Sequence, residues 1–163
     1  MNIKTAVATL ILLTLSISGA WYRLTKHPTP APDATFTSIT GQTLSLNQLR
    51  GKPVLVTFWA TDCPSCIEEI PHLIELYQRY TERGLTIIAV TMPYDPPNHV
   101  LAMAKHKQLP YFVAMDPAGT LTEAFGNVLV TPTTFLIDRN GNICIHKVGA
   151  FDPDSLRQQL ETF

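Results

Sequence analysis

The chain has few cysteines and almost no net charge, and each shortage excludes a class of protein. Its 163 residues include three cysteines, too few for a scaffold held together by disulfides. Twelve basic residues balance thirteen acidic ones, so the net charge of −1 gives no electrostatic basis for binding nucleic acid. The length and the 45% share of hydrophobic residues suit one folded domain with a proper core.

Ligands for a metal ion are also sparse. Cys63 and Cys66 form a C-x-x-C pair, which is half of a zinc site and raises that alternative. Zinc would need two more thiol or imidazole ligands at close spacing, but Cys144 stands alone and no His-x3–5-His pair accompanies it. The histidines are scattered and the methionines form no Met-rich motif, so we interpret them as surface or packing residues and expect no metal.

The longest uncharged run lies at the start of the chain. After Lys4, residues 5–22 carry no charge and would span roughly 27 Å as a helix, just enough for a bilayer core. Residues 21–23 (Trp-Tyr-Arg) have the composition of an interfacial belt. We therefore expect residues 1–23 to be a transmembrane anchor, and the alternative is a signal peptide cleaved after the small residues 18–20.

Either form would export the remainder of the chain. We expect a bacterial inner-membrane protein with its domain in the periplasm, or a soluble periplasmic protein if the segment is cleaved. Residues 24–33 are rich in proline and predict a stiff tether. Residues 34–163 would form the folded domain. No cysteine precedes Cys63, so we do not expect lipoprotein processing.

Alternating apolar runs and helical repeats predict an α/β domain. The expected order is strands, helix, strand, helix, strand, helix, hairpin and helix, which gives a mixed central sheet, parallel in the middle, with helices on both faces. Asn140-Gly141 between two apolar runs predicts the hairpin. Thr120 is a candidate N-cap, and Asp152 with Pro153 predicts the N-cap and first residue of the last helix.

One stretch concentrates the chemistry. Residues 54–59 (Val-Leu-Val-Thr-Phe-Trp) predict a buried strand, and the two cysteines then open a helix. A thiol at the start of a helix meets unpaired N–H groups and the positive end of the dipole, which favour the thiolate. The thiolate attacks disulfides. Cys63 could therefore attack from the first turn, and Cys66, one turn in, could resolve a mixed disulfide.

A longer pattern extends beyond the cysteines. It comprises Phe58-Trp-Ala-Thr-Asp-Cys-Pro-Ser-Cys66, then Glu69 and Pro71, then Val130-Thr-Pro-Thr-Thr-Phe-Leu-Ile-Asp138 and Asn140-Gly141. Over about residues 35–163 the chain resembles the TlpA/ResA-type membrane-anchored thiol-disulfide oxidoreductases of the thioredoxin-like superfamily. The resemblance implies a thioredoxin fold. It implies no cofactor other than a redox-active Cys63–Cys66 disulfide.

The resemblance also implies roles for residues around the cysteines. Pro132 would be cis and would pack beside them, and Thr131 would offer its backbone to an extended substrate segment. Trp59, Asp62 and Pro64 would border the surface on which a substrate docks. A carboxylate at Asp62 departs from the bulky or neutral residue usual there, and should make Cys63 less acidic. A solvated loop carboxylate without effect is the alternative.

Proton handling is expected to fall to Glu69. The resemblance places an acidic residue under the active-site helix at this position, where it could take the proton of Cys66. Ordinary thioredoxins carry a buried Asp six residues before the attacking cysteine, but this chain has Thr57, which cannot titrate. The simpler interpretation is that Glu69 is an ordinary surface glutamate beside Glu68. Cys144 lies within an apolar strand and is expected to be a small core residue.

The expected function is therefore a periplasm-facing thiol-disulfide oxidoreductase that reduces disulfides in exported proteins. Cytochrome c maturation or redox homeostasis is the expected setting, and a transmembrane thiol reductant of the DsbD or CcdA kind is the expected partner. A peroxiredoxin-like peroxidase is one alternative, but that chemistry requires threonine three residues before the cysteine, where this chain has Ala60. A copper-delivery protein of the Sco type is another, but such proteins use C-x3-C and a downstream histidine.

Overall fold

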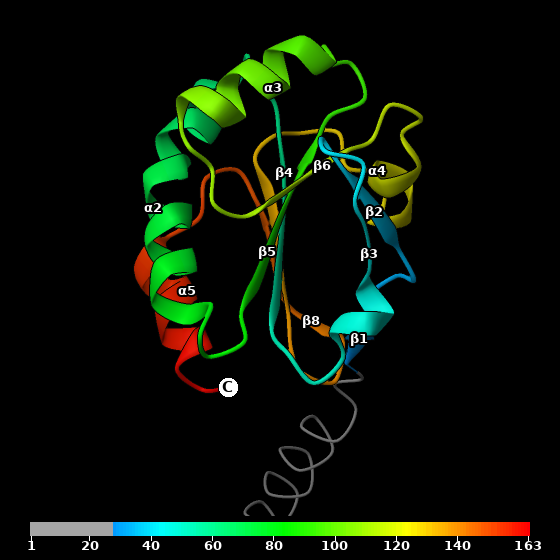
Figure 1. Cartoon of the computed structure of the whole chain (residues 1–163). Helices are drawn as coiled ribbons and strands as arrows, with labels where there is room; N and C mark the ends of the chain where they lie inside the picture. The colour runs from blue at the N-terminus through cyan, green and yellow to red at the C-terminus, as the bar shows by residue number, and fades with distance from the viewer. Residues whose placement is uncertain (1–27) are drawn as a thin grey trace, which may run out of the picture.

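A mixed sheet of eight strands runs through the centre of the molecule (Figure 1). The computed structural model describes residues 28–163, and its strand order is β1-β8-β7-β4-β5-β6-β2-β3. The expected anchor at 1–23 and the first part of the expected tether lie outside the described residues. Within residues 28–163, no helix has both the length and the apolar character needed to cross a membrane.

The elements follow the expected order, with one addition at the start. The strands are β1 (Thr29–Pro30), β2 (Thr35–Ser38), β3 (Thr43–Ser45), β4 (Val54–Trp59), β5 (Thr86–Thr91), β6 (Phe112–Met115), β7 (Thr133–Ile137) and β8 (Asn142–Val148). The helices are the short 3₁₀-helix η1 (Leu46–Leu49) and the α-helices α2 (Pro64–Tyr80), α3 (Pro97–His106), α4 (Thr120–Ala124) and α5 (Pro153–Leu160).

Strand β4 is the centre of the sheet. It pairs in parallel with β5 and antiparallel with β7, and all six of its residues are buried. A strand buried on both faces is apolar throughout rather than alternating, which is the pattern from residue 54 to residue 59. Strands β5 and β6 extend the parallel part, whereas β7 and β8 form the expected antiparallel hairpin. The mixed sheet predicted from the sequence is confirmed.

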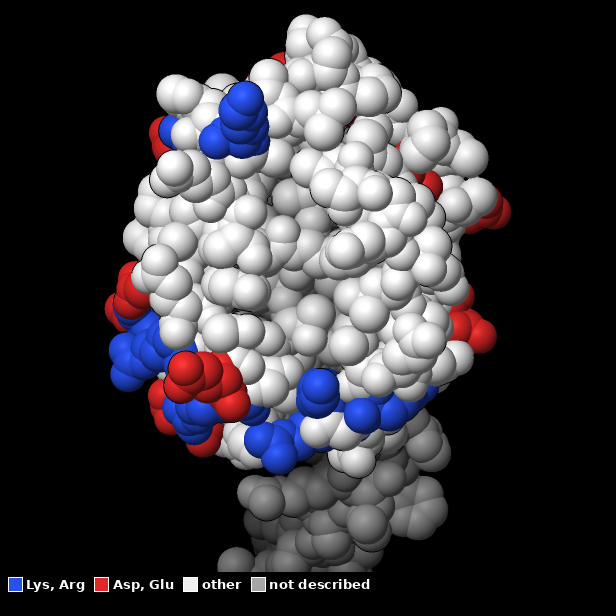
Figure 2. Space-filling view, viewed as in Figure 1, with Lys and Arg blue, Asp and Glu red and all other residues white. Residues whose placement is uncertain are grey.

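Helices cover both faces of the sheet. Figure 1 shows α2 and α5 on one side and α4 on the other. The Tyr80 hydroxyl in α2 donates to Glu161 at 2.7 Å, and Arg157 in α5 pairs with Glu75 of α2 at 2.8 Å. Asp152 caps α5 by accepting from the Asp154 N–H, as the sequence predicts. Charged side chains on the face in Figure 2 gather mainly at the end where β1 lies.

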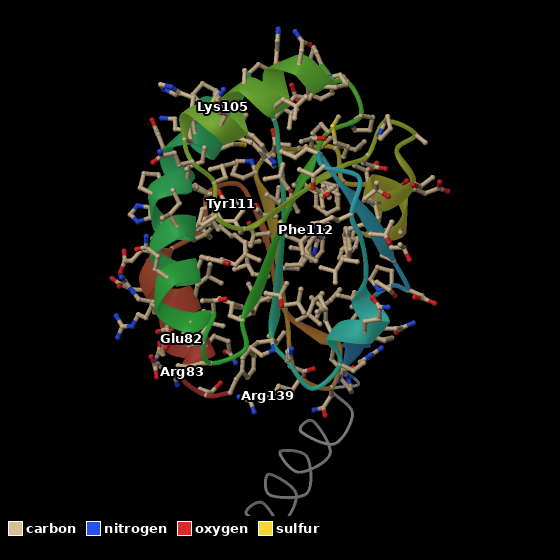
Figure 3. All side chains as sticks on the ribbon, in the orientation of Figure 1. Glu82, Arg83, Lys105, Tyr111, Phe112 and Arg139 are labelled. Atoms are coloured by element: carbon tan, nitrogen blue, oxygen red, sulfur yellow. A yellow bond between two sulfur atoms is a disulfide. The ribbon has the colours of Figure 1, made fainter. Side chains whose placement is uncertain are left out.

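Aromatic rings fill the space on either side of β4. Phe58, Phe125 and Phe135 lie with ring centroids 5.1–6.1 Å apart on the side of α4. On the side of α2, Tyr111 lies between the helix and the sheet, with its ring 6.4 Å from that of Tyr77 (Figure 3). The sheet, whose strand β4 leads into the helix with the cysteines, is thus packed on both faces.

The proline-rich segment is packed against the domain where the structure describes it. Thr29 and Pro30 pair with Ile143 and Asn142 of β8, and the Ala31 N–H donates to Gly141 O at 2.9 Å. This corrects the expectation that the stiff tether extends through residue 33. Proline is tolerated here because an edge strand needs no N–H on its outer side.

Two smaller expectations are also corrected. The N-cap of α4 is Gly119, not Thr120, because the Asp116 carboxylate takes the N–H groups of Leu121 and Thr122 at 3.0 and 2.8 Å. Cys144 is exposed rather than in the core. Its strand has only the two-residue β1 beyond it, and alternation turns the cysteine away from the half-buried Ile143 and Ile145 on either side.

Candidate active site

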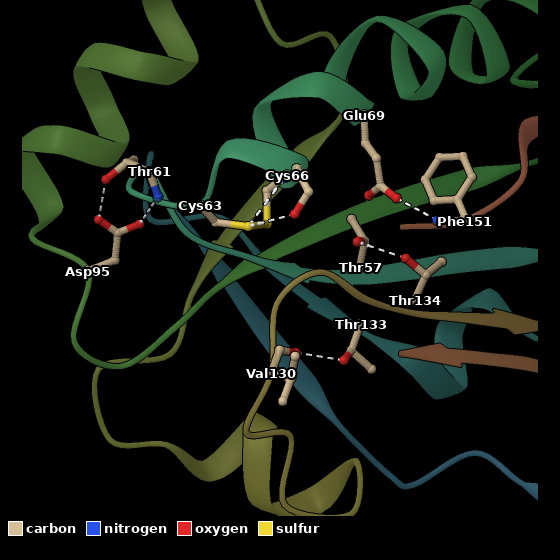
Figure 4. The surroundings of a disulfide bond; sticks show 11 residues. Thr57, Thr61, Cys63, Cys66, Glu69, Asp95, Val130, Thr133, Thr134 and Phe151 are labelled. Carbon is tan, nitrogen blue, oxygen red and sulfur yellow. Dashed lines mark hydrogen bonds between the residues drawn. A yellow bond between two sulfur atoms is a disulfide. The ribbon is translucent and has the colours of Figure 1, made fainter. Parts of the chain in front are cut away.

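The two cysteines lie at the carboxyl end of β4, where α2 begins. Cys63 is the N-cap of α2, and its Sγ accepts the Cys66 N–H at 3.2 Å. The two are joined as a disulfide with Cα atoms 5.3 Å apart (Figure 4). Cys63 is 9% exposed and Cys66 2%. The sulfur nearer the surface is therefore the one at the helix N-terminus, where N–H groups and the dipole stabilise a thiolate.

Glu69 belongs to the same helix, one turn beyond Cys66, and lies on the side that faces the sheet. It is only 5% exposed, and its carboxylate accepts the Phe151 N–H at 2.6 Å. Burial raises its pKa from 4.5 to about 7, although the hydrogen bond from Phe151 opposes the shift. Glu69 and Cys66 line one small cavity together with Thr57 and Trp59. The surface interpretation is thus wrong for Glu69, whereas Glu68 is exposed.

A pair of hydroxyl groups lies below this cavity. Thr57 of β4 and Thr134 of β7 are opposite each other in the sheet, with their Oγ1 atoms 3.0 Å apart. Thr57 is 1% exposed and Thr134 is fully buried. The two hydroxyls satisfy each other, so this position is polar but carries no titratable group. Glu69 supplies the carboxyl group that lines the cavity with Cys66.

The segment before β7 forms another part of the surroundings. The Thr131–Pro132 peptide bond is cis, as expected, and Pro132 is buried while Thr131 is half-buried. The Thr133 hydroxyl donates to Val130 O at 2.7 Å and fixes the bend (Figure 4). Val130 is 53% exposed. Binding of substrate by Thr131 stays a prediction.

The remaining candidates divide into buried and exposed residues. Trp59 is 5% exposed and lines the cavity behind the cysteines, so it is a packing residue that offers a substrate almost no surface. Asp62 and Pro64 flank Cys63 and are both exposed. Their contact with a substrate stays a prediction. Among residues 28–163, no group of three or more His, Cys, Asp or Glu side chains is arranged to hold a metal ion.

Sequence reasoning missed Asp95, in the loop between β5 and α3. Its carboxylate accepts both the N–H and the hydroxyl of Thr61, two residues before Cys63. The prolines at positions 93, 96 and 97 by themselves indicate only a rigid loop there. A usable signal existed, because β4 and β5 are parallel neighbours and the carboxyl ends of such strands meet at one edge of a sheet. A polar residue directly after β5 is therefore expected near the turn that follows β4.

Comparison with known proteins identifies the family. The profile of the Redoxin family matches residues 26–161. This chain belongs to the Redoxin family. It is 33% identical over 133 residues to the thiol-disulfide oxidoreductase ResA of Bacillus thuringiensis subsp. konkukian, which covers 82% of this chain and 73% of that protein. The ResA of Geobacillus thermodenitrificans is 34% identical over 132 residues, covering 81% and 75%.

Solved structures agree with the sequence comparison. The thioredoxin-family thiol:disulfide interchange protein of Chlorobium tepidum superposes with a TM-score of 0.76 at 29% identity, over 83% of this chain and 96% of that one. The fold of this Redoxin-family member is therefore thioredoxin-like. Together with the Cys63–Cys66 pair, the relatives make the protein a thiol-disulfide oxidoreductase that acts on dithiols and disulfides of proteins.

Proposed function

We propose that the protein works as a reductase of disulfides in exported proteins, with Cys63 as the attacking nucleophile. The arrangement that carries this proposal is the Cys63–Cys66 pair at the N-terminus of α2, above a buried carboxyl group whose pKa is about 7. The more exposed sulfur is activated by the helix, and the more buried one is next to a group able to accept a proton near neutral pH.

The reaction would run in two exchanges. The Cys63 thiolate attacks one sulfur of a substrate disulfide, which forms a mixed disulfide and expels the other substrate sulfur as a thiolate. Cys66 then attacks the Cys63 sulfur, which closes the Cys63–Cys66 disulfide and releases the second substrate thiol. Two electrons pass to the substrate. A transmembrane thiol reductant of the DsbD or CcdA kind would return the pair to the dithiol form.

Glu69 supports the second exchange. Cys66 must lose its proton before it can attack, because the thiolate and not the thiol is the nucleophile. Glu69 lines the same cavity and is close to half ionised at neutral pH, so it can take that proton and later release it. Thr57 and Thr134 cannot fill this role at neutral pH, since hydroxyl groups do not ionise there.

The cellular setting is also part of the proposal. Residues 5–22 have the length and composition of an anchor, which would hold the domain on the periplasmic side of a bacterial inner membrane. Substrates would dock across Asp62, Pro64 and Thr131, which lie at or near the surface around Cys63. Apocytochrome c thiols awaiting haem attachment are one substrate class of this kind.

The reduction potential tests the direction of electron flow. We would equilibrate the full chain, in detergent, with glutathione buffers and follow the Cys63–Cys66 couple, using Cys63→Ser as the control. A potential around −250 mV or lower supports a reductase, whereas a value near −120 mV would make the protein a donor of disulfides. If no reversible couple appears, the enzymatic proposal fails.

A further inference from the structure

Asp95 is a buried carboxylate that the proposed reaction does not use. It is 5% exposed, and both of its oxygens are engaged by one residue (Figure 4). Oδ2 accepts the Thr61 N–H at 2.7 Å, and Oδ1 accepts the Thr61 hydroxyl at 2.6 Å. Hydrogen bonds of this length to an ionised carboxylate are among the strong ones in proteins. Asp95 therefore holds Thr61 firmly, two residues before Cys63.

The loop that carries Asp95 is itself held in place. The Asp95 N–H donates to Met92 O at 3.1 Å, which closes a turn. Pro96 and Pro97 follow as the N-cap and first residue of α3, and their rings fix the backbone angle φ. The loop that carries the carboxylate is thus stiff, so little conformational entropy is lost when Asp95 forms its hydrogen bonds with Thr61.

A second observation concerns the same loop and the turn before Cys63. Burial raises the pKa of Tyr94, and the carboxylates of Asp62 and Asp95 add to that rise, whereas a hydrogen bond with the Thr131 side chain opposes it. The charge of Asp62, in the turn before Cys63, therefore acts on Tyr94 in the loop that carries Asp95. That turn is closed by the Cys63 N–H, which donates to Ala60 O at 3.2 Å.

We propose that Asp95 is a positioning residue for the redox site. By holding Thr61, it keeps the turn from Ala60 to Cys63 in the conformation that presents the Cys63 sulfur at the N-terminus of α2. Asp95 acts through Thr61 and does not touch the reacting sulfurs. This inference rests on the proposed function, because it concerns the rate at which Cys63 attacks a disulfide.

The test compares variants on both sides of the contact. Asp95→Asn and Thr61→Val each weaken the hydrogen bonding between the two residues at nearly constant side-chain volume. Thr61→Ser keeps both donors, the N–H and the hydroxyl. The rate at which the reduced full chain attacks oxidised glutathione is the readout, since so small a disulfide reports presentation of Cys63 rather than docking. We expect Asp95→Asn and Thr61→Val to be slower by roughly tenfold, the factor that one hydrogen bond to a charged group allows.

Three results decide whether Asp95 has this role. Thr61→Ser should remain within about twofold of the wild-type rate, and the double variant should be no slower than the slower single variant, because both changes break one contact. Unchanged rates in both single variants, or losses that multiply in the double variant, would overturn the role of Asp95. If Asp95→Asn fails to fold, the Thr61→Val and Thr61→Ser pair decides alone. A wild-type protein without a reversible Cys63–Cys66 couple would refute the proposed function instead.

Discussion

A hydrogen bond of 2.6 Å joins the buried Glu69 carboxylate to the backbone N–H of Phe151, a residue 82 positions later in the chain. The contact connects α2 to the segment just before α5. It binds the helix that carries the cysteines to the far end of the domain, and it favours the ionised form of a group that burial pushes toward the neutral form. Protonation of Glu69 is therefore coupled to folding.

Glu69→Gln should remove a pH dependence of stability. The pKa of Glu69 is about 7 in the folded protein against 4.5 ordinarily, so the folded state binds the proton more tightly than the unfolded chain. The resulting stability is fully present below pH 4.5 and is lost as the pH rises to about 7. At pH 8 the variant should be more stable than the wild type by about 1–3 kcal/mol.

Chemical denaturation of the oxidised proteins at several pH values measures this effect, because the disulfide form has no titrating Cys63 or Cys66. Glu68→Gln is the matched control, since it removes the same charge from an exposed neighbour and should leave the pH profile unchanged. Parallel profiles for the wild type and Glu69→Gln between pH 5 and pH 8 would show that Glu69 titrates normally.

The two cysteines should behave differently when each is replaced by serine. In Cys66→Ser, Cys63 still attacks a substrate disulfide but nothing resolves the product, so a stable mixed disulfide should accumulate. In Cys63→Ser, the remaining thiol is 2% exposed and should trap little. Non-reducing electrophoresis after incubation with a disulfide-containing protein distinguishes them. Equal trapping by both variants would show that either sulfur can make the first attack, against this prediction.

Asp62→Asn should make Cys63 more acidic. The exposed Asp62 carboxylate stands directly before Cys63, and a negative charge there disfavours the thiolate that the helix N-terminus favours. We expect Cys63 to have a lower pKa in the variant than in the wild type. The pH dependence of Cys63 alkylation measures both. The same Cys63 pKa in both proteins would contradict the expected influence of Asp62.

Thr57→Val should destabilise the protein more than the double change Thr57→Val with Thr134→Val. The single change leaves the fully buried Thr134 hydroxyl without its partner, which costs about 1–3 kcal/mol. The double change removes both polar groups at nearly constant volume and should lie closer to the wild type. Unfolding free energies measure the difference.

Thr91→Val is the control for that pair. Thr91 is equally buried in the neighbouring strand, but its hydroxyl has no hydrogen-bond partner within residues 28–163. Its replacement should be neutral or stabilising. If Thr57→Val and Thr91→Val have the same effect, the hydrogen bond between Thr57 and Thr134 contributes nothing to stability.

Much of the fold could be predicted because local patterns agree with the tertiary structure. The apolar run of β4, the Asn140-Gly141 turn and the Asp152 cap are each determined by neighbours in sequence, and all three are confirmed. The cysteines at the start of α2 follow from the same local signals. Helical spacing places Glu69 on the same face as Cys66 and Leu73, but a carboxylate is rarely buried, so the sequence left a surface position open as well.

The errors have tertiary causes. Pairing of Thr29 with Ile143 depends on an unoccupied edge of β8, which no pattern within the proline-rich segment reveals. The exposure of Cys144 has the same origin, since a strand near the edge is covered on fewer sides. Asp95 escaped notice because its partner Thr61 is 34 residues away and is brought to it only by the parallel pairing of β4 and β5.

The pairing of β1 with β8 places the start of the domain at the end of the sheet opposite the cysteines. Thr29 lies beside Ile143, at the end of the sheet where β4 begins, whereas Cys63 follows the other end of β4. Six strand residues separate the two ends by about 20 Å. A domain attached to any support through the chain ahead of residue 28 would thus hold its sulfurs at the end that faces away from the support. The distance at which the sulfurs could meet a substrate would be that spacing added to the length of the attaching segment.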